Sequence, residues 1–265
     1  MKLGIVLRNM GPQSQPALLR ACARAADAAG LDALWVTDHL AIPPDDAEGS
    51  GGRYLDPLAT LAWLASATER IGLGTSVLVL PYRPPLPTAK AVATVQELSG
   101  GRLLLGVGVG WMAPEFRALG VERHRRGALA DETLAFLHRC FAADEAEAHG
   151  QPFLFLPRPA RPPIFVGGAP PHALERAARH GDGWMPMGGE PDALAPHVRA
   201  LRARKPGAEV VLMTALPLDD PPRARERIAA FAEAGVTRIV QGTGRYDEPG
   251  FRAAVDALAR LRDAT

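Results

Sequence analysis

Short runs of apolar residues alternate with amphipathic stretches from one end of this chain to the other. An apolar run of about four to eight residues is typical of a buried strand, and apolar residues recurring every three or four positions are typical of a helix. The runs Val77-Leu78-Val79-Leu80 and Leu103-Leu104-Leu105 have the continuous form of strands buried on both faces. The pattern predicts strands at about 3–8, 31–37, 71–80, 102–109, 163–166, 184–186, 210–214 and 237–241.

A helical stretch follows each predicted strand. In the first of them Leu18, Cys22, Ala25 and Ala29 recur at helical spacing, and Gly30 ends the stretch. The predicted helices lie at about 15–29, 56–69, 87–99, 127–142, 170–180, 192–204, 221–234 and 248–262, with a shorter turn at 114–119.

This succession of strand–helix units predicts an α/β fold, a (β/α)8 TIM barrel built as a single domain over residues 1–265. An open, doubly wound sheet is the rival, but the glycine fingerprint of its first turn is absent after Leu7. The proline-rich stretch at about 143–162 is expected to be an inserted loop, with a small hairpin near 152–156.

The composition narrows the class of protein. Hydrophobic residues make up 47% of the chain, enough for one large core, and the net charge is only +1. This balance argues against nucleic acid as the main partner, because phosphates require a clustered excess of Lys and Arg. No apolar run reaches the roughly 18 residues of a membrane span, and the N-terminal run is too short for a signal peptide. We expect a cytoplasmic protein with no membrane partner, in which Cys22 and Cys140 are buried.

Loops at the carboxyl ends of the strands build the active site of such a barrel. The second predicted strand ends in Thr37-Asp38-His39, and histidine is well suited to exchange a proton near neutral pH. His39 is therefore a catalytic candidate. The alternative is that Asp38 caps a helix and His39 is merely half-exposed. Neighbours on a straight strand point to opposite sides, so both residues face the mouth only if the strand has bent.

Small residues fill the third and fourth strands. Around Thr75, Ser76 and Val77 they indicate a bulge or the close approach of a ligand, with simple barrel packing as the alternative. The glycines of the fourth strand, up to Gly108-Val109-Gly110, leave room for a flat ligand that Trp111 could wall. Their spacing does not match a dinucleotide-binding fingerprint.

The fifth strand leads through Gly167-Gly168-Ala169 into a helix that begins at Pro170-Pro171. Backbone N–H groups at a helix N-terminus form an anion site, and proline cannot donate. The donors would be Gly167, Gly168 and Ala169, with His172 one turn in. A tight turn that needs a positive φ is the alternative.

The residue patterns that other kinds of active site require are absent from the sequence. No His-x-x-x-His pair or carboxylate cluster predicts a metal site, so no metal is expected. No Gly-x-Ser-x-Gly elbow indicates an acyl hydrolase. An isomerase or aldolase acting on phosphorylated ligands would need a Lys or a carboxylate at a strand end. The lysines, Lys2, Lys90 and Lys205, lie away from the predicted mouth.

Taken together, the chain resembles the luciferase-like monooxygenase family, whose members are barrels that bind FMN or the deazaflavin coenzyme F420. The resemblance covers nearly the whole chain, and its motifs are specific in their order and spacing. The matching segments are 34–39, 71–75, 101–111, 166–168 and 177–184.

The resemblance implies roles for individual residues. In the F420 branch a His at the position of His39 lies against the deazaflavin ring, with Asp38 beside it in the cofactor site. A non-proline cis peptide within Thr75-Ser76-Val77 would press on the other face. Gly108, Val109 and Gly110 would flank the ring, and Gly167, Gly168 and Ala169 would hold the phosphate. Glu115 lies close to where some relatives have an acidic residue.

The function implied is hydride transfer between F420 and a small organic substrate, for which Asn9, Trp111 and Met187 are the expected contacts. An FMN-dependent monooxygenase fed by a separate reductase is the alternative, as is a barrel that binds flavin without catalysis. A flavin or F420 reductase is the expected functional partner, and the sequence leaves undecided whether the chain forms a homodimer. Basic residues that could meet an acidic cofactor tail are Arg53, Arg83, Arg123, Arg125 and Arg126.

Overall fold

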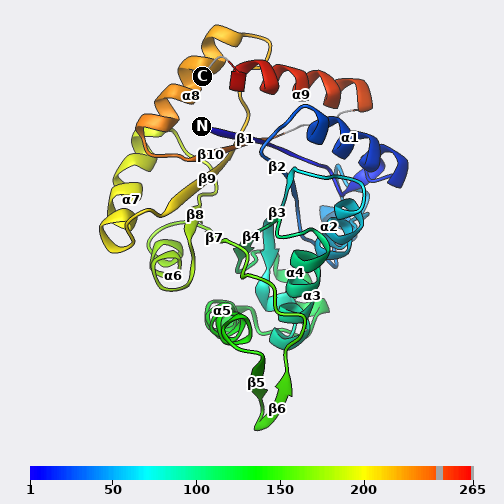
Figure 1. Ribbon diagram of the computed structural model, residues 1–265, viewed down its shortest axis with the longest axis vertical. Helices are drawn as coiled ribbons and strands as arrows, with labels where there is room; N and C mark the ends of the chain where they lie inside the picture. The colour runs from blue at the N-terminus through cyan, green and yellow to red at the C-terminus, as the bar shows by residue number, and fades with distance from the viewer. Residues whose placement is uncertain (243–246, 264–265) are drawn as a thin grey trace.

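The chain folds into a closed barrel of parallel strands surrounded by helices (Figure 1). The computed structural model describes residues 1–242 and 247–263. The strands follow one another around the barrel in chain order, and β1 closes the ring by pairing with β10. The barrel strands are β1 (Lys2–Val6), β2 (Ala33–Val36), β3 (Gly72–Val79), β4 (Leu103–Gly108), β7 (Ile164–Gly167), β8 (Gly183–Met185), β9 (Glu209–Thr214) and β10 (Arg238–Gln241).

The predicted TIM barrel is therefore confirmed, and every predicted strand–helix unit is present. The helices around it are α1 (Pro16–Ala28), α2 (Pro57–Ala65), α3 (Pro85–Leu98), α5 (Arg126–Ala142), α6 (His172–His180), α7 (Pro191–Arg204), α8 (Pro221–Glu233) and α9 (Glu248–Asp263). Short helices are α4 (Ala113–Ala118) and the 3-10 turns η1 (Gly11–Gln13), η2 (Pro44–Asp46), η3 (Leu80–Tyr82) and η4 (Arg123–Arg125).

Helix starts follow local chemistry. Proline occupies the first turn of α1, α2, α3, α7 and α8, where a missing N–H costs nothing. The carboxylates of Asp56 and Asp220 accept hydrogen bonds from the N–H groups of Ala59 and Arg223, at 2.9 and 3.2 Å. Asp56, and not Asp38, is thus the cap of the helix that follows the second strand.

Trp35 fills the inside of the barrel and explains several of its small residues. It packs in a buried interior cluster with Phe165, Met185, Val211 and others. A Cβ on Gly74 would lie only 2.3 Å from Cε3 of Trp35. Packing against Trp35 therefore accounts for Gly74, while the register of the third strand shifts between Thr75 and Leu78 as a bulge.

Several element ends differ from the sequence prediction by one to four residues, and two further differences change the local picture. The second strand ends at Val36, so Asp38 and His39 belong to a loop and both can line the same cavity. The hairpin near 152–156 begins earlier: β5 (Glu145–Ala148) pairs with β6 (Gln151–Leu154). The turn between them has left-handed backbone at His149 and Gly150. The sequence did not predict β5, because its alternating Glu and Ala residues form no apolar run. The hairpin projects away from the barrel in Figure 1.

Both cysteines are buried and free, as expected. Among the described residues, no helix combines the length and the apolar character needed to cross a membrane.

Candidate functional site

A cavity of about 410 Å³ opens at the carboxyl ends of the barrel strands. It collects most of the predicted site residues, which come from β3, β4 and β7 and from the loops after β2, β4, β7 and β8. Its lining is Thr37, Asp38, His39, Ser76, Val77, Val79, Tyr82, Gly108, Val109, Gly110, Trp111, Gly167, Gly168, Met185, Pro186, Met187 and Met213.

Asp38 stabilises the loop that carries His39. Its buried carboxylate accepts hydrogen bonds from Nη1 and Nη2 of Arg83, at 2.6 and 2.9 Å, and from the N–H of Val79 at 2.8 Å. Nη2 of Arg83 also donates to Asp56, at 2.8 Å. Bidentate pairs of this kind are both strong and directional. Asp38 lines the cavity, but both of its oxygens already accept hydrogen bonds from Arg83 and Val79, so Asp38 positions the loop.

His39 is oriented by a fully buried carboxylate. Nδ1 of His39 lies 2.8 Å from Oε2 of Glu115, whose side chain is 0% exposed. The same carboxylate accepts hydrogen bonds from the N–H groups of Leu40 and Ala41, at 2.7 and 3.0 Å, and from the hydroxyl of Tyr82 at 2.9 Å. This arrangement fixes the ring and leaves Nε2 of His39 without a partner among the described residues.

Four donors keep Glu115 ionised despite its burial. Burial alone would raise the pKa of this carboxyl, but the N–H groups of Ala41 and Leu40, together with His39 and Tyr82, lower it below its ordinary value. The pKa of Tyr82 is raised by burial and by its hydrogen bond to Glu115, so the phenol stays protonated as a donor. The pair of Glu115 and His39 therefore has the form of an oriented proton-exchanging imidazole.

Val77 forms part of the cavity wall opposite a set of glycines. The Ser76–Val77 peptide is cis, at the place where the family resemblance implied such a bond. A Cβ on Gly108 would lie 2.4 Å from Cγ2 of Val77, and one on Gly167 would lie 2.8 Å from its Cγ1. A side chain at either position would collide with Val77, so both glycines line the cavity with backbone alone.

The start of α6 offers fewer donors than the sequence indicated. The N–H of Gly168 is occupied, because it donates to the carbonyl of Met185 at 3.2 Å. Among the described residues, the N–H groups of Ala169 and His172 have no hydrogen-bond partner. Gly168 has a φ of +127°, which favours glycine there. An anion at this helix end would therefore be held through Ala169 and His172.

Of the three residues expected to contact the substrate, two line the cavity and one does not. Trp111 and Met187 line the cavity and are unusually exposed, at 63% and 78%. Asn9 is instead 0% exposed and lies outside the lining. Its amide donates to the carbonyls of Thr37 and Leu55 at 2.8 Å and accepts from the N–H of Thr37, so it braces the His39 loop. Thr75 is also outside the lining, and its hydroxyl donates to the carbonyl of Gly106.

Sequence reasoning missed Tyr82 and gave Glu115 only a weak role. It expected Arg83 to meet an acidic cofactor tail, but Arg83 is paired with Asp38 and Asp56. Glu115 is 76 positions from His39, so no local pattern joins them. Its one signal is an acidic residue in the first turn of α4, directly after the mouth of β4.

Comparison with known proteins identifies a family. The luciferase-like monooxygenase family matches residues 1–263. One uncharacterised protein of Mycobacterium tuberculosis is 34% identical over 190 residues, which are 65% of this chain and 66% of that protein. A second is 30% identical over 284 residues, with 98% of both chains covered. The F420-dependent hydroxymycolic acid dehydrogenase of the same organism is 33% identical over 198 residues, 69% of this chain and 52% of that one.

Solved structures share the fold at low identity. An F420-dependent secondary alcohol dehydrogenase in complex with an F420–acetone adduct superposes with a TM-score of 0.79 at 16% identity, covering 99% of both chains. The oxygenating constituent of 3,6-diketocamphane monooxygenase from Pseudomonas putida, in complex with FMN, gives 0.78 at 15% identity and covers 98% of this chain and 97% of that one.

Proposed function

This chain belongs to the luciferase-like monooxygenase family and is an oxidoreductase, and we propose that it transfers a hydride between coenzyme F420 and a small organic substrate. The observation that carries the proposal is the imidazole of His39, oriented by a buried and ionised Glu115 at the edge of an apolar cavity. A relative in this family that is 33% identical uses F420, which favours the deazaflavin over FMN.

The residues at the cavity fit a flavin-type cofactor. Val77 and the backbone of Gly108 and Gly167 line the apolar cavity of about 410 Å³, where the ring would lie. The free N–H groups of Ala169 and His172 at the start of α6 would hold the phosphate, which the helix dipole also stabilises. When bound, F420 supplies a ring carbon that gives or takes a hydride.

The chain's own residues would do the rest. Nε2 of His39 exchanges the proton that accompanies the hydride, while Glu115 accepts from Nδ1 and fixes the tautomer. Trp111 and Met187 present apolar surface around the mouth and would contact the substrate and exclude water. Within the cavity lining, Asp38 is paired with Arg83 and the hydroxyl of Tyr82 donates to Glu115, which leaves His39 as the proton-exchanging group.

The first experiment is a fluorescence titration of the protein with oxidised F420 and, separately, with FMN. We expect micromolar or tighter binding of F420 and weaker binding of FMN. Gly168→Asp should weaken F420 binding by at least about tenfold, because it places a negative charge and a side chain where the phosphate would lie. Gly207→Asp is the matched control, since Gly207 also has a positive φ, +81°, but lies in open space between α7 and β9.

Turnover tests the role of His39. With F420 and a panel of small alcohols and ketones, His39→Ala should lower kcat by about 10²- to 10⁴-fold, the usual contribution of a general acid or base. The affinity for F420 should change far less. Tighter binding of reduced FMN than of F420 would instead assign the chain to the monooxygenases. Binding of neither cofactor would refute the proposal.

A further inference from the structure

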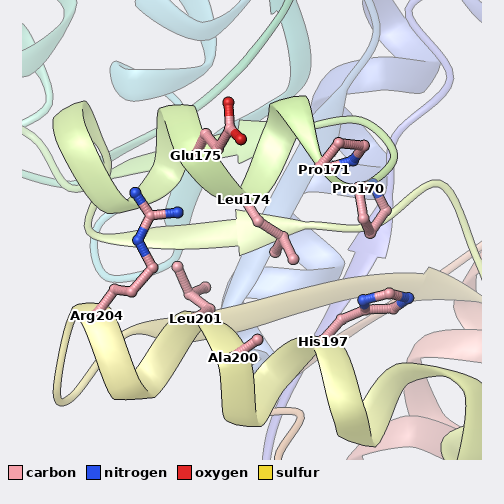
Figure 2. A pocket seen from close by; sticks show the side chains of 8 residues that line it. All are labelled: Pro170, Pro171, Leu174, Glu175, His197, Ala200, Leu201 and Arg204. Carbon is pink, nitrogen blue, oxygen red and sulfur yellow. The ribbon is translucent and has the colours of Figure 1, made fainter.

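A second hollow, of about 380 Å³, lies outside the barrel between α6 and α7 (Figure 2). Its floor is apolar and consists of Leu174 from α6 and Ala200 and Leu201 from α7. One end is formed by Pro170 and Pro171, the two residues that follow directly on the proposed phosphate loop. The groove therefore begins where the described cofactor site ends.

Two charged residues line the groove, Arg204 and Glu175, and they face different ways. In Figure 2 the guanidinium of Arg204 rises from α7 towards α6 at the end opposite Pro170, and His197 lies near Pro170 and Pro171. Arg204 has no ion-pair or hydrogen-bond partner among the described residues. The carboxylate of Glu175 points away from α7, on the outer side of α6.

An unpaired cation at the end of an apolar groove favours an extended ligand that carries a carboxylate. His197 and Arg204 are seven residues apart on α7, so the groove follows about 10 Å of helix at 1.5 Å per residue. An extended chain covers that distance with about three residue-sized units.

We propose that this groove binds the acidic tail of the deazaflavin, with a tail carboxylate paired to Arg204 and with His197 beside the chain. The inference rests on the proposed function. F420 continues beyond its phosphate through a lactyl group into glutamyl residues, whereas FMN ends at the phosphate. The groove would therefore help the chain to distinguish the two cofactors at a place remote from the ring.

The test compares two charge reversals on the same helix. Arg204 and Arg199 are both exposed residues of α7, but only Arg204 lines the groove. Each of Arg204→Glu and Arg199→Glu is titrated with F420 and with the same deazaflavin phosphate lacking glutamyl residues. At low ionic strength Arg204→Glu should weaken binding of F420 by about five- to tenfold, because an exposed ion pair is replaced by repulsion. The loss should shrink as salt is added.

The tail-less ligand should bind wild type and both variants alike, and Arg199→Glu should bind F420 as wild type does. Equal affinity of wild type and Arg204→Glu for F420, or equal losses in the two variants, would overturn the inference while leaving the proposed function intact. Failure of both ligands to bind wild-type protein would overturn the proposed function and the inference with it.

Discussion

The two ends of the barrel both bury ionisable side chains, and they do so differently. At the base, where the strands begin, Arg238 is 3% exposed and lies between Asp32 and Glu209, with Lys2 beyond at 3.7 Å from Glu209. Burial lowers the pKa of Arg238 to about 10. At the mouth, two buried carboxylates, Asp38 and Glu115, are each saturated by several donors.

The difference lies in which group faces a cavity. At the base the cation is enclosed, and its acidic partners are partly open to water, at 23% and 32% exposure. At the mouth the carboxylates are enclosed, and His39, the partner of Glu115, faces the cavity with one ring nitrogen free. The base therefore closes the barrel, whereas the mouth fixes one imidazole in place. This distribution matches the general division of such barrels into a stabilising and a catalytic end.

The largest effect on stability should come from Glu115→Ala. The change leaves the N–H groups of Leu40 and Ala41 and the hydroxyl of Tyr82 buried without an acceptor. We expect a loss of about 3 to 5 kcal/mol in the free energy of unfolding, measured with urea. Glu115→Gln keeps one acceptor oxygen and the packing, so it should lose less. Equal stability of Glu115→Ala and wild type would show that the pair is not held as described.

The pH dependence of stability should show the same carboxylate. Because the folded-state pKa of Glu115 lies below its ordinary value of 4.5, its contribution is present above pH 4.5 and is lost as the pH falls through the folded pKa. Asp27 and Asp182 also have lowered pKa values and titrate in every variant. The difference in stability between wild type and Glu115→Gln should therefore isolate Glu115 and narrow below pH 4.5. A constant difference would contradict the lowered pKa.

At the base, Arg238→Met should have a smaller effect. It removes a buried cation and leaves Asp32 and Glu209, which can be hydrated, with Lys2 still near Glu209. Removing one partner of a buried ion pair is costly when it leaves a buried charge unpaired, but the two carboxylates that remain here are partly open to water, at 23% and 32% exposure. We expect a change within about 1 kcal/mol in unfolding free energy and unchanged F420 affinity. A large loss of cofactor binding would refute the separation of the two ends.

The fold could be predicted from the sequence because its signals are local. Runs such as Leu103-Leu104-Leu105 and capped helices such as the one opened by Asp56-Pro57 each reveal an element by themselves. The errors lie at element ends, as at β5, where alternating Glu and Ala gave no apolar run. The sequence indicated that the glycines lie in turns and close contacts, but it could not show that Gly108 and Gly167 pack against Val77.

The candidate site was predictable only in part, because its geometry depends on contacts between distant segments. His39 and the glycine loops were found at strand ends. The contact of Glu115 with His39 spans 76 positions, and that of Arg83 with Asp38 spans 45. Asn9 was expected to contact the substrate because it is a polar residue at a strand end, but its side chain hydrogen-bonds to backbone groups instead. Residue type at a strand end indicates a site, but the tertiary fold decides whether a polar atom is free.

The smallest effect on stability, and the sharpest contrast with the base, should come from Trp111→Ala. Trp111 is 63% exposed, so its truncation uncovers little buried surface and should change the unfolding free energy by no more than about 0.5 kcal/mol. Its ring nevertheless stands edge-on to His39 at 6.3 Å between centroids and lines the cavity. An exposed aromatic at the edge of an apolar cavity contributes to binding when a ligand covers it, so KM for apolar substrates should rise about tenfold while F420 affinity changes little.

Leu98→Ala is the control, because Leu98 is about as exposed, at 61%, but lies at the end of α3, outside the cavity lining. If both variants left KM unchanged, the exposed apolar surface at the mouth would not be the substrate contact.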